Sequence, residues 1–498
     1  MKLHHDKDSD AASAILQLYH NGKRDEASAA LARYWPDTTP STSILQVALQ
    51  LHFNQYDFQN CLLIIAELDQ RNSHNADTFY LAGCLYKKLN LPAKSLAALN
   101  RAIAINPDYF DAILNVGHLQ RYTGNTEQAI NTYKSLFRFS SRLDTVIYSL
   151  TAISSYVASP DEVALLTRLW QRPGTQNANK ARAGFALYRH YASLRNYSKA
   201  AKFLEGANAA MHLVRPYQDN ISRFVRLVCA TFTPDYASAT PAIRHDPHTP
   251  VFIVGLPRSG STLLESMLAN NPTVTPLGEN QIMAEIILHV SGSRTPSSRN
   301  ILNAFASVTP EVVQSTSALY GSLLELYGKT AILLDKSLTN FLYIGFIKRL
   351  FPDARFIHLT RNPLDLCFNC FEMRFTHGHA YSFSLDSLAE YYLHYHNLMR
   401  HWTRLFPSDI LSVSYENLVT DTSATLTRVT QFLALDQTEK LQDVARDKAA
   451  FTPSTEQIRK PVHSNSVGKA RHYSALLEPL KDRLVQAGIN VEAGWPQG

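Results

Sequence analysis

The segment of residues 251–272, VFIVGLPRSGSTLLESMLANNP, restricts the possible folds of this chain more than any other segment. Its first five residues have the apolar, β-branched character of a buried strand, and they lead into a glycine-rich turn from Gly255 to Gly260. An amphipathic helix is expected to begin directly after the turn. Strand, turn and helix together form an anion cradle, because backbone N–H groups point inward and the helix dipole adds about half a positive charge.

This segment differs from the nucleoside triphosphate loop, G-x-x-x-x-G-K-[ST], at one informative position. Both glycines have the right spacing and Thr262 takes the last place, but Ser261 replaces the lysine that reaches the β- and γ-phosphates. The strand-like run RFIHLT also ends in Thr360-Arg361 rather than in a metal-binding aspartate. The cradle therefore favours a phosphate ligand without a magnesium site. A P-loop nucleotide kinase stays an alternative that magnesium dependence would test.

Three further runs resemble short buried strands, at residues 331–335, 355–360 and 410–415. Longer helical stretches separate them, for example residues 387–406. Buried strands that alternate with helices predict a parallel, doubly wound α/β sheet.

The first half of the chain contains an internal repeat of 34 residues. Gly83 recurs as Gly117, and the small residues Ser95 and Ala129 each follow twelve positions later. The period and the small positions resemble the tetratricopeptide repeat. Small residues let two antiparallel helices approach closely, and Pro107 ends the second helix.

Weaker copies flank this pair, and we count five or six repeat-like units between residues 8 and 215. One period earlier, Leu49 and Cys61 occupy the matching positions, and residues 182–210 form another helix pair downstream. The proline-rich segment 232–250 marks a domain boundary.

The predicted organisation is an all-α repeat solenoid, residues 8–230, followed by a P-loop-like α/β domain, residues 248–490. No run approaches the about 18 apolar residues of a membrane span, and the N-terminus is polar and lacks the apolar region of a secretory signal. We therefore expect a cytoplasmic protein without a membrane association. A net charge of +6 on 498 residues is too small and diffuse to indicate nucleic acid.

The motif PRSGST resembles the 5′-phosphosulfate loop of sulfotransferases, which use 3′-phosphoadenosine 5′-phosphosulfate (PAPS). The second signature of that family is a strand, an arginine and a helix with a polar residue eight positions later. Arg361 and Asn369 fit this signature, although the family usually has serine at the latter position. Asn362 and Pro363 suit the start of the helix.

Residues 248–480 resemble the sulfotransferase domain of bacterial proteins that couple tetratricopeptide repeats to a sulfotransferase, and these are similar to tyrosylprotein sulfotransferases. The resemblance implies that Glu279 is a general base, whose raised pKa would come from a partly desolvated pocket. It implies that Lys336 stabilises the bridging oxygen and Arg258 the sulfonate oxygens. Glu279 as a helix N-terminal residue and Lys336 as a solvated strand-end lysine are the structural alternatives.

The resemblance also implies a set of residues that hold PAPS. They are Arg258, Ser259, Gly260, Ser261, Thr262, Arg361, Asn369, Tyr415, Ser454 and Lys469. Arg471 is a weaker candidate. The structural alternatives are that Tyr415 is a packed tyrosine at the sheet edge and that Ser454 and Lys469 belong to a basic surface loop.

Other polar motifs are expected to be structural. Cys367 and Cys370 lie at helical spacing without a second cysteine pair, so we predict core thiols rather than a redox or metal site. His377 and His379 lack the further ligands of a metal site. The aromatic residues near helical spacing predict core packing; they are Tyr391, Tyr392, Tyr395 and Trp402.

The predicted function is a sulfotransferase that moves a sulfuryl group from PAPS to an acceptor hydroxyl, with no metal expected. A repeat scaffold with an inactive domain is the second alternative. The acceptor follows only from resemblance, which points to tyrosine in a peptide held by the repeat groove. The sequence does not distinguish this acceptor from carbohydrates or small phenols, and it does not determine the oligomeric state.

Overall fold

The computed structural model describes most of the 498-residue chain. The described residues are 2–34, 40–55, 57–72, 75–235, 249–280, 282–291, 301, 303, 309–324, 332–376, 378–436, 441 and 462–492.

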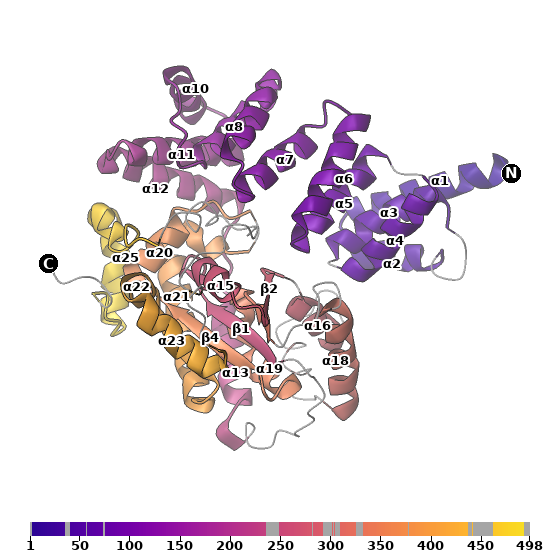
Figure 1. The fold of residues 1–498 in the computed structure, drawn as a ribbon. Coiled ribbons are helices and arrows are strands. Elements are labelled where there is room, and N and C mark those ends of the chain that lie inside the picture. Colours follow the sequence, from indigo (N-terminus) through magenta and orange to yellow (C-terminus); the bar gives the residue numbers. More distant parts are fainter. Residues whose placement is uncertain are drawn as a thin grey trace. The chain divides into compact units, whose positions relative to one another are not determined.

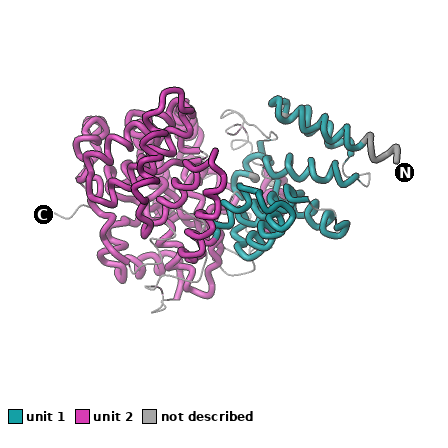
Figure 2. The backbone as a smooth tube through the Cα atoms, turned by 90° about the horizontal axis from the view of Figure 1, so that it is seen from above, with its two compact units in different colours: residues 1–119, 281–295 teal, residues 120–280, 296–498 magenta. Residues whose placement is uncertain are grey.

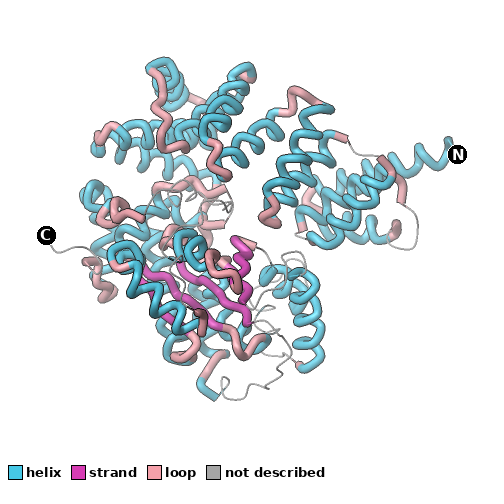
Figure 3. The backbone as a smooth tube through the Cα atoms, in the orientation of Figure 1, coloured by secondary structure: helices cyan, strands magenta, loops and turns pink. Residues whose placement is uncertain are grey.

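The first half of the chain is helical throughout its described part (Figures 1 and 3). Most of these helices pack against the next one in the chain. They are α1 (Lys2–His20), α2 (Arg24–Ala32), α3 (Thr42–Asn54), α4 (Phe58–Gln70), α5 (Ala76–Lys88), α6 (Pro92–Ile105), α7 (Phe110–Tyr122), α8 (Thr126–Ser135), α9 (Leu143–Thr151), α10 (Pro160–Gln171), α11 (Asn177–Ser193), α12 (Tyr197–Val214) and α13 (Ile221–Thr231).

The small positions of the repeat lie where the two helices of a pair cross. The hydroxyl of Ser95 donates to the carbonyl of Gly83 at 2.6 Å, and the Cys61 thiol lies 3.9 Å from the carbonyl of Leu49 one period earlier. A Cβ atom at Gly83 would lie 2.6 Å from Cγ of Leu99. The repeat prediction is therefore confirmed, since only small residues permit this helix spacing.

The second half contains a five-stranded parallel sheet with the order β2-β3-β1-β4-β5. The strands are β1 (Thr249–Gly255), β2 (Val274–Gly278), β3 (Ile332–Asp335), β4 (Arg355–Thr360) and β5 (Ile410–Ser414). Four of them are the predicted strands. The sequence analysis missed β2, an edge strand that contains Pro276, a residue that weakens a strand signal but is tolerated at an edge.

Helices cover the sheet and follow its strands. They are α15 (Ser261–Leu268), α16 (Ile282–Ser291), α18 (Pro310–Leu324), α19 (Ile344–Leu350), α20 (Pro363–Phe371), α21 (Leu385–Leu405), α22 (Tyr415–Thr420), α23 (Thr422–Leu433) and α25 (Ser474–Gln486). One sheet face packs apolar side chains such as Ile253, Ile357 and Val413 against α15 and α23. None of the described helices has the length and hydropathy that crossing a membrane requires.

The chain divides into two compact units, one of residues 1–119 with 281–295 and the other of residues 120–280 with 296–498 (Figure 2). The second unit therefore contains the sheet together with α8–α13. Asn208 on α12, for example, donates to the carbonyl of Phe371 at 2.9 Å. The two compact units are defined by contacts in space, whereas the predicted domains are defined by the sequence pattern, so the domain boundary at 230–248 stays a prediction. Most of that linker lies outside the described residues.

Candidate active site

The carboxyl ends of all five strands carry a residue or loop that the sequence analysis singled out. Along the sheet edge, β2 is followed by Glu279, β3 by Lys336, β1 by the loop 256–260, β4 by Arg361 and β5 by Tyr415. Because the strands are parallel, these ends lie at one edge, where doubly wound sheets bind ligands. The structure thus brings together residues up to 159 positions apart.

The loop after β1 can be built only with glycine at two positions. Gly255 has φ +153°, and a Cβ atom there would lie 2.8 Å from the carbonyl oxygen of Leu359. Gly260 has φ +100°, and a Cβ atom would lie 2.4 Å from Cδ2 of Tyr415. Gly260 also caps α15, so the loop backbone and the helix N-terminus share one turn, as in other anion-binding loops.

The side chains of this loop are turned inward. Ser259 is fully buried, and its hydroxyl has no hydrogen-bond partner among the described residues. Ser261 and Thr262 are each 5% exposed. A buried hydroxyl without a partner is rare in folded proteins, and a ligand in the cradle would supply the missing partner.

Lys336 lies between two carboxylates. Its Nζ atom is 3.1 Å from Oε1 of Glu279 and 3.4 Å from Oε2 of Glu265, and the lysine is fully buried. Burial alone would lower the pKa of Lys336, but the two carboxylates outweigh it and raise that pKa. The amine is therefore held as an ammonium ion beside the anion loop.

Glu265 is a site residue that the sequence analysis missed. Its buried carboxylate accepts the N–H of Gly278 at 3.0 Å besides facing Lys336, so it joins α15 to the ends of both β2 and β3. Burial raises the pKa of Glu265, and Lys336 opposes that effect. A glutamate within the mostly apolar stretch LLESMLA was the available sequence signal.

Glu279 differs from its expected surroundings. The sequence analysis placed it in a partly desolvated pocket, whereas 52% of its side chain is exposed in the structure. The physical reason is that Glu279 follows an edge strand, which leaves one flank of the residue uncovered by the sheet. The carboxylate is thus accessible to an acceptor and paired with Lys336.

Arg361 connects three segments of the site. Its Nη1 donates to the carbonyl of Arg258 at 3.1 Å, its Nη2 donates to the carbonyl of Ser466, and its guanidinium lies 4.2 Å from the centroid of the Tyr415 ring. Its Nε atom is buried and has no partner among the described residues. Tyr415 therefore packs against Arg361 and Gly260, and whether it also contacts a cofactor stays a prediction.

Helix α20 begins as predicted. The side-chain oxygen of Asn362 accepts the N–H groups of Leu364 and Asp365, each at 3.0 Å, and Pro363 is the first helical residue. Asn369 lies one turn further on and donates its amide to the carbonyl of Asp365. That bond engages one amide hydrogen within the helix, and the phosphate contact of Asn369 stays a prediction.

The C-terminal segment is held beside α20 by Asp365, the second residue that the sequence analysis missed. Its carboxylate accepts the N–H of Gly468 at 2.6 Å and that of Ala470 at 2.8 Å. Lys469 forms an ion pair with the buried Glu372 at 2.6 Å, and its phosphate contact stays a prediction. Arg471 is exposed, and Ser454 lies outside the described residues.

The two cysteines of α20 are buried and free. The Cys370 thiol lies 3.2 Å from the carbonyl of Pro257, and burial raises its pKa to about 12. Such a thiol is unreactive, which agrees with the predicted structural role. His379 is half-buried, and desolvation lowers its pKa to about 4, whereas His377 lies outside the described residues.

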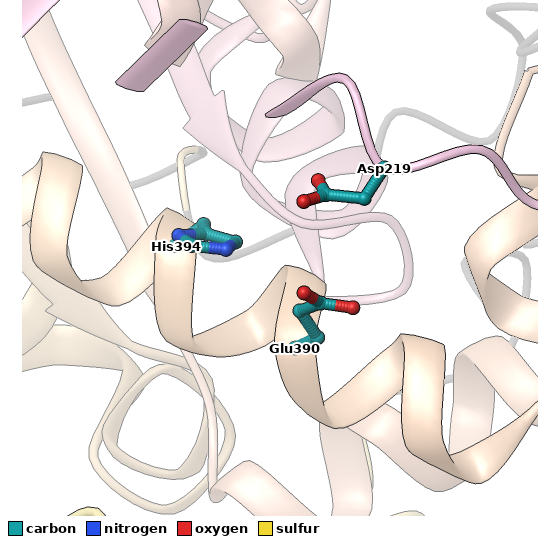
Figure 4. A group of neighbouring side chains, drawn as sticks. All are labelled: Asp219, Glu390 and His394. Carbon is teal, nitrogen blue, oxygen red and sulfur yellow. The ribbon is translucent and has the colours of Figure 1, made fainter. Parts of the chain in front are cut away.

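One group of side chains in the second unit has the reach of a metal site. The ligand atoms of Asp219, Glu390 and His394 lie within 4.8 Å of one another, with the latter two a turn apart on α21 (Figure 4). Asp219 is exposed and already accepts the N–H of Ser222 at 3.1 Å. Since exposed acidic groups are common without an ion, we assign no metal here.

Two family models match the chain. Residues 250–439 match the sulfotransferase family, and residues 76–109 match the tetratricopeptide repeat. The match to the sulfotransferase family thus begins within β1 and includes the other four strands of the sheet.

Curated relatives match all or part of the chain. An uncharacterized protein of Aquifex aeolicus is 23% identical over 95% of this chain and 64% of its own length. A putative protein-tyrosine sulfotransferase of Caenorhabditis briggsae is 24% identical over 38% of this chain, and protein-tyrosine sulfotransferase 1 of Homo sapiens is 33% identical over 22%. These two alignments span 67% and 31% of the relatives' lengths.

Solved sulfotransferase structures resemble the chain in part. The sulfotransferase domain of the Synechococcus PCC 7002 olefin synthase has a TM-score of 0.35 and 21% identity, over 50% of this chain and 98% of that domain. The sulfotransferase domain of the curacin biosynthetic pathway has a TM-score of 0.31 and 17% identity, over 49% and 99%.

Proposed function

We propose that this chain transfers a sulfuryl group from PAPS to an acceptor hydroxyl. One observation carries the proposal. An anion loop and an ammonium–carboxylate pair, Lys336 and Glu279, lie together at the carboxyl ends of the parallel strands. Sulfuryl transfer needs both, because negative charge develops on the leaving oxygen while the acceptor loses a proton.

The residues present fit the donor. The loop backbone and the buried hydroxyls of Ser259 and Thr262 would hold its 5′-phosphosulfate, and Arg361 would meet its 3′-phosphate. The Ser259 hydroxyl and the Arg361 Nε atom support this fit, since each is buried and has no hydrogen-bond partner in the described part of the chain.

In the proposed step the acceptor oxygen attacks sulfur, and the bond between sulfur and the 5′-phosphate oxygen breaks. The acceptor proton passes to the carboxylate of Glu279. The charge released on the 5′-phosphate is stabilised by the ammonium of Lys336, which Glu265 holds in place. The products are the sulfated acceptor and 3′-phosphoadenosine 5′-phosphate (PAP).

We propose a tyrosine-containing peptide as the acceptor, because two of the relatives are described as protein-tyrosine sulfotransferases. The helical repeats would present an extended peptide on a concave surface. Carbohydrate and small phenol acceptors are the competing classes, and an acceptor screen separates them.

Calorimetric titration of PAP into the full chain, with EDTA present, tests the donor. We expect metal-independent binding that weakens about tenfold to a hundredfold in Arg361→Ala, the range for hydrogen bonds to a charged group. Glu279→Gln should leave PAP binding intact and lower the transfer rate from PAPS about 10²- to 10⁴-fold. Magnesium-dependent ATP binding without PAP binding would refute the proposal.

A further inference from the structure

A cavity of about 370 Å³ opens between strand β4, the edge strand β5 and helix α21. It belongs to the second compact unit, and its lining includes Arg361, which follows the carboxyl end of β4. Its lining residues are His358, Thr360, Arg361, Leu366, Tyr392, Tyr395, His396, Met399, Arg400, Thr403, Arg404 and Ser412. Its volume falls in the range of small-molecule pockets.

The floor of this cavity is polar, although the opposite face of the same strands is apolar. His358 on β4 is 8% exposed, its Nε2 atom lies 2.6 Å from the Tyr395 hydroxyl, and its Nδ1 atom lies 3.3 Å from the Ser412 hydroxyl. Burial lowers the pKa of His358 to about 4, so the imidazole is neutral near pH 7. Buried polar side chains on a sheet face are informative because a stable core does not need them.

The charge around the cavity has one sign. Three arginines line it, Arg361, Arg400 and Arg404, and no lining residue is acidic. Arg400 and Arg404 are one turn apart on α21, where like charges destabilise a helix. In the described part of the chain, no carboxylate forms an ion pair with either of them. An anion between them would relieve this repulsion.

The remaining wall is aromatic and apolar. Tyr392 and Met399 on α21 and Leu366 on α20 contribute it. A bare inorganic ion would leave this wall uncovered, whereas an aromatic or apolar body would bury it.

We infer that this cavity binds a small organic anion, a phosphate or sulfate ester on an aromatic or apolar body. The site is distinct from the β1 loop, because its floor lies on the face of β4 and β5 opposite to the α15 side. Arg361 belongs to both places, so the pocket ligand and the sulfuryl donor would influence each other's affinity; this linkage, unlike the pocket, rests on the proposed function.

Calorimetric titration of phenyl phosphate into the full chain tests the pocket. We expect the double substitution Arg400→Gln and Arg404→Gln to weaken binding by at least about tenfold, because two charged hydrogen-bond donors are lost. The matched control is Arg428→Gln, an exposed arginine on α23 outside the cavity lining, which should leave the affinity unchanged. Thermal unfolding of each variant excludes a folding defect.

Two competition arms make the result decisive. Phenyl phosphate that still binds at saturating PAP, even with altered affinity, supports the pocket, and weaker binding of inorganic phosphate supports the role of the aromatic wall. Full displacement by PAP, or affinity unaffected by the double substitution, would overturn the inference. Failure of PAP itself to bind would count against the proposed function only, since the phenyl phosphate titration stands without it.

Discussion

At the scale of single residues, Lys336 shows how one side chain serves both stability and chemistry. It is fully buried, and its charge is matched by the buried Glu265 on one side and the half-exposed Glu279 on the other. Removing one member of a buried pair leaves the other charge without compensation, which is costly. A loss of activity in a Lys336 variant would therefore not distinguish a destabilised fold from the loss of a catalytic group.

A double substitution separates the two roles. We expect Lys336→Met to lower the unfolding free energy by about 3–5 kcal/mol, and Lys336→Met with Glu265→Gln to recover most of that loss. Both should lower the transfer rate at least about 100-fold, because the stabilising ammonium is absent. Denaturant unfolding and PAPS turnover measure the two effects.

Lys348→Met is the matched control for this experiment. Lys348 is also mostly buried, and its ammonium lies 2.9 Å from Asp409, away from the strand ends that form the site. The Lys348→Met variant should have a lower unfolding free energy, and its folded fraction should turn over PAPS at the rate of the natural chain. Recovery of turnover together with stability in the Lys336 double variant would contradict the assigned role.

Asp335 makes the stability of this region depend on pH. Burial raises the pKa of its carboxyl from 3.8 to about 6, while Ser337 donates its N–H to Oδ1 at 2.7 Å. The folded state binds more protons than the unfolded state between these two values, so the unfolding free energy falls as pH rises from about 4 to about 6. The upper limit of this contribution is about 3 kcal/mol.

Asp335→Asn should remove that contribution. The amide oxygen can still accept the N–H of Ser337, and no charge is buried at any pH. We expect the difference in unfolding free energy between the variant and the natural chain to grow in favour of the variant across pH 4 to 6. Unfolding titrations at five pH values measure it, and parallel profiles for the two proteins would show that Asp335 does not titrate in this window.

At the scale of elements, the loop between β1 and α15 depends on a close approach between backbone and ring. Gly260 combines a left-handed φ of +100° with direct contact to Tyr415, which itself supports Arg361. A side chain at this position would displace the tyrosine and, through it, the arginine. The geometry of the loop is thus coupled to that of the β4 end.

Gly260→Ala should weaken PAP binding at least about tenfold and lower stability by about 1–3 kcal/mol. Gly174→Ala is the control, because Gly174 has a similar left-handed φ of +75° with no atom within 4 Å of an added Cβ. The Gly174→Ala variant has the backbone strain without the clash. Its unfolding free energy should therefore fall by about 1 kcal/mol, while its PAP affinity stays unchanged. Equal effects of both substitutions would show that backbone strain alone, without the contact to Tyr415, explains the requirement for glycine at position 260.

At the scale of the whole molecule, the last repeat-like helix pair is part of the same compact unit as the sheet. Asn208 on α12 donates to Phe371, Tyr188 on α11 donates to the buried Glu372, and Arg215 donates to Phe375 at 3.1 Å. Glu372 in turn pairs with Lys469 of the C-terminal segment. Helices α11 and α12 therefore stabilise the part of the α/β fold around α20.

A fragment that begins at residue 240 should fail to fold cooperatively. It retains every residue of the predicted α/β domain, but it lacks Asn208, the donor to Phe371, and Tyr188, the donor to Glu372. We expect no sharp thermal transition and no PAP binding, measured by near-ultraviolet circular dichroism and calorimetry. Full-chain PAP affinity in this fragment would show that the repeats are dispensable for the fold.

Point variants give the same test in the full chain. Asn208→Ala should lower the unfolding free energy by about 1–3 kcal/mol, the cost of leaving a buried carbonyl without its donor. Asn115→Ala is the control, because Asn115 donates to the carbonyl of Asp111 one turn back at 2.9 Å, as Asn208 does to that of Leu204 at 3.0 Å, but lies in the first compact unit. Only the Asn208 variant should weaken PAP binding.

The sequence by itself determined the features that depend on neighbours along the chain. The 34-residue period predicted the helix pairs, the glycine spacing predicted the anion loop, and Asn362-Pro363 predicted the start of α20. Each of these follows from backbone conformation or helix packing within about one repeat, which local composition encodes.

Only the tertiary structure decided which distant groups meet. Strand order placed Glu279 after an edge strand and left it half exposed, and packing of α15 against the sheet brought Glu265 to Lys336. The partner of Lys469 proved to be Glu372, nearly one hundred residues earlier. The physical reason is that the free energy of a buried charge depends on its surroundings in space, and those surroundings are assembled from segments that the linear pattern does not relate.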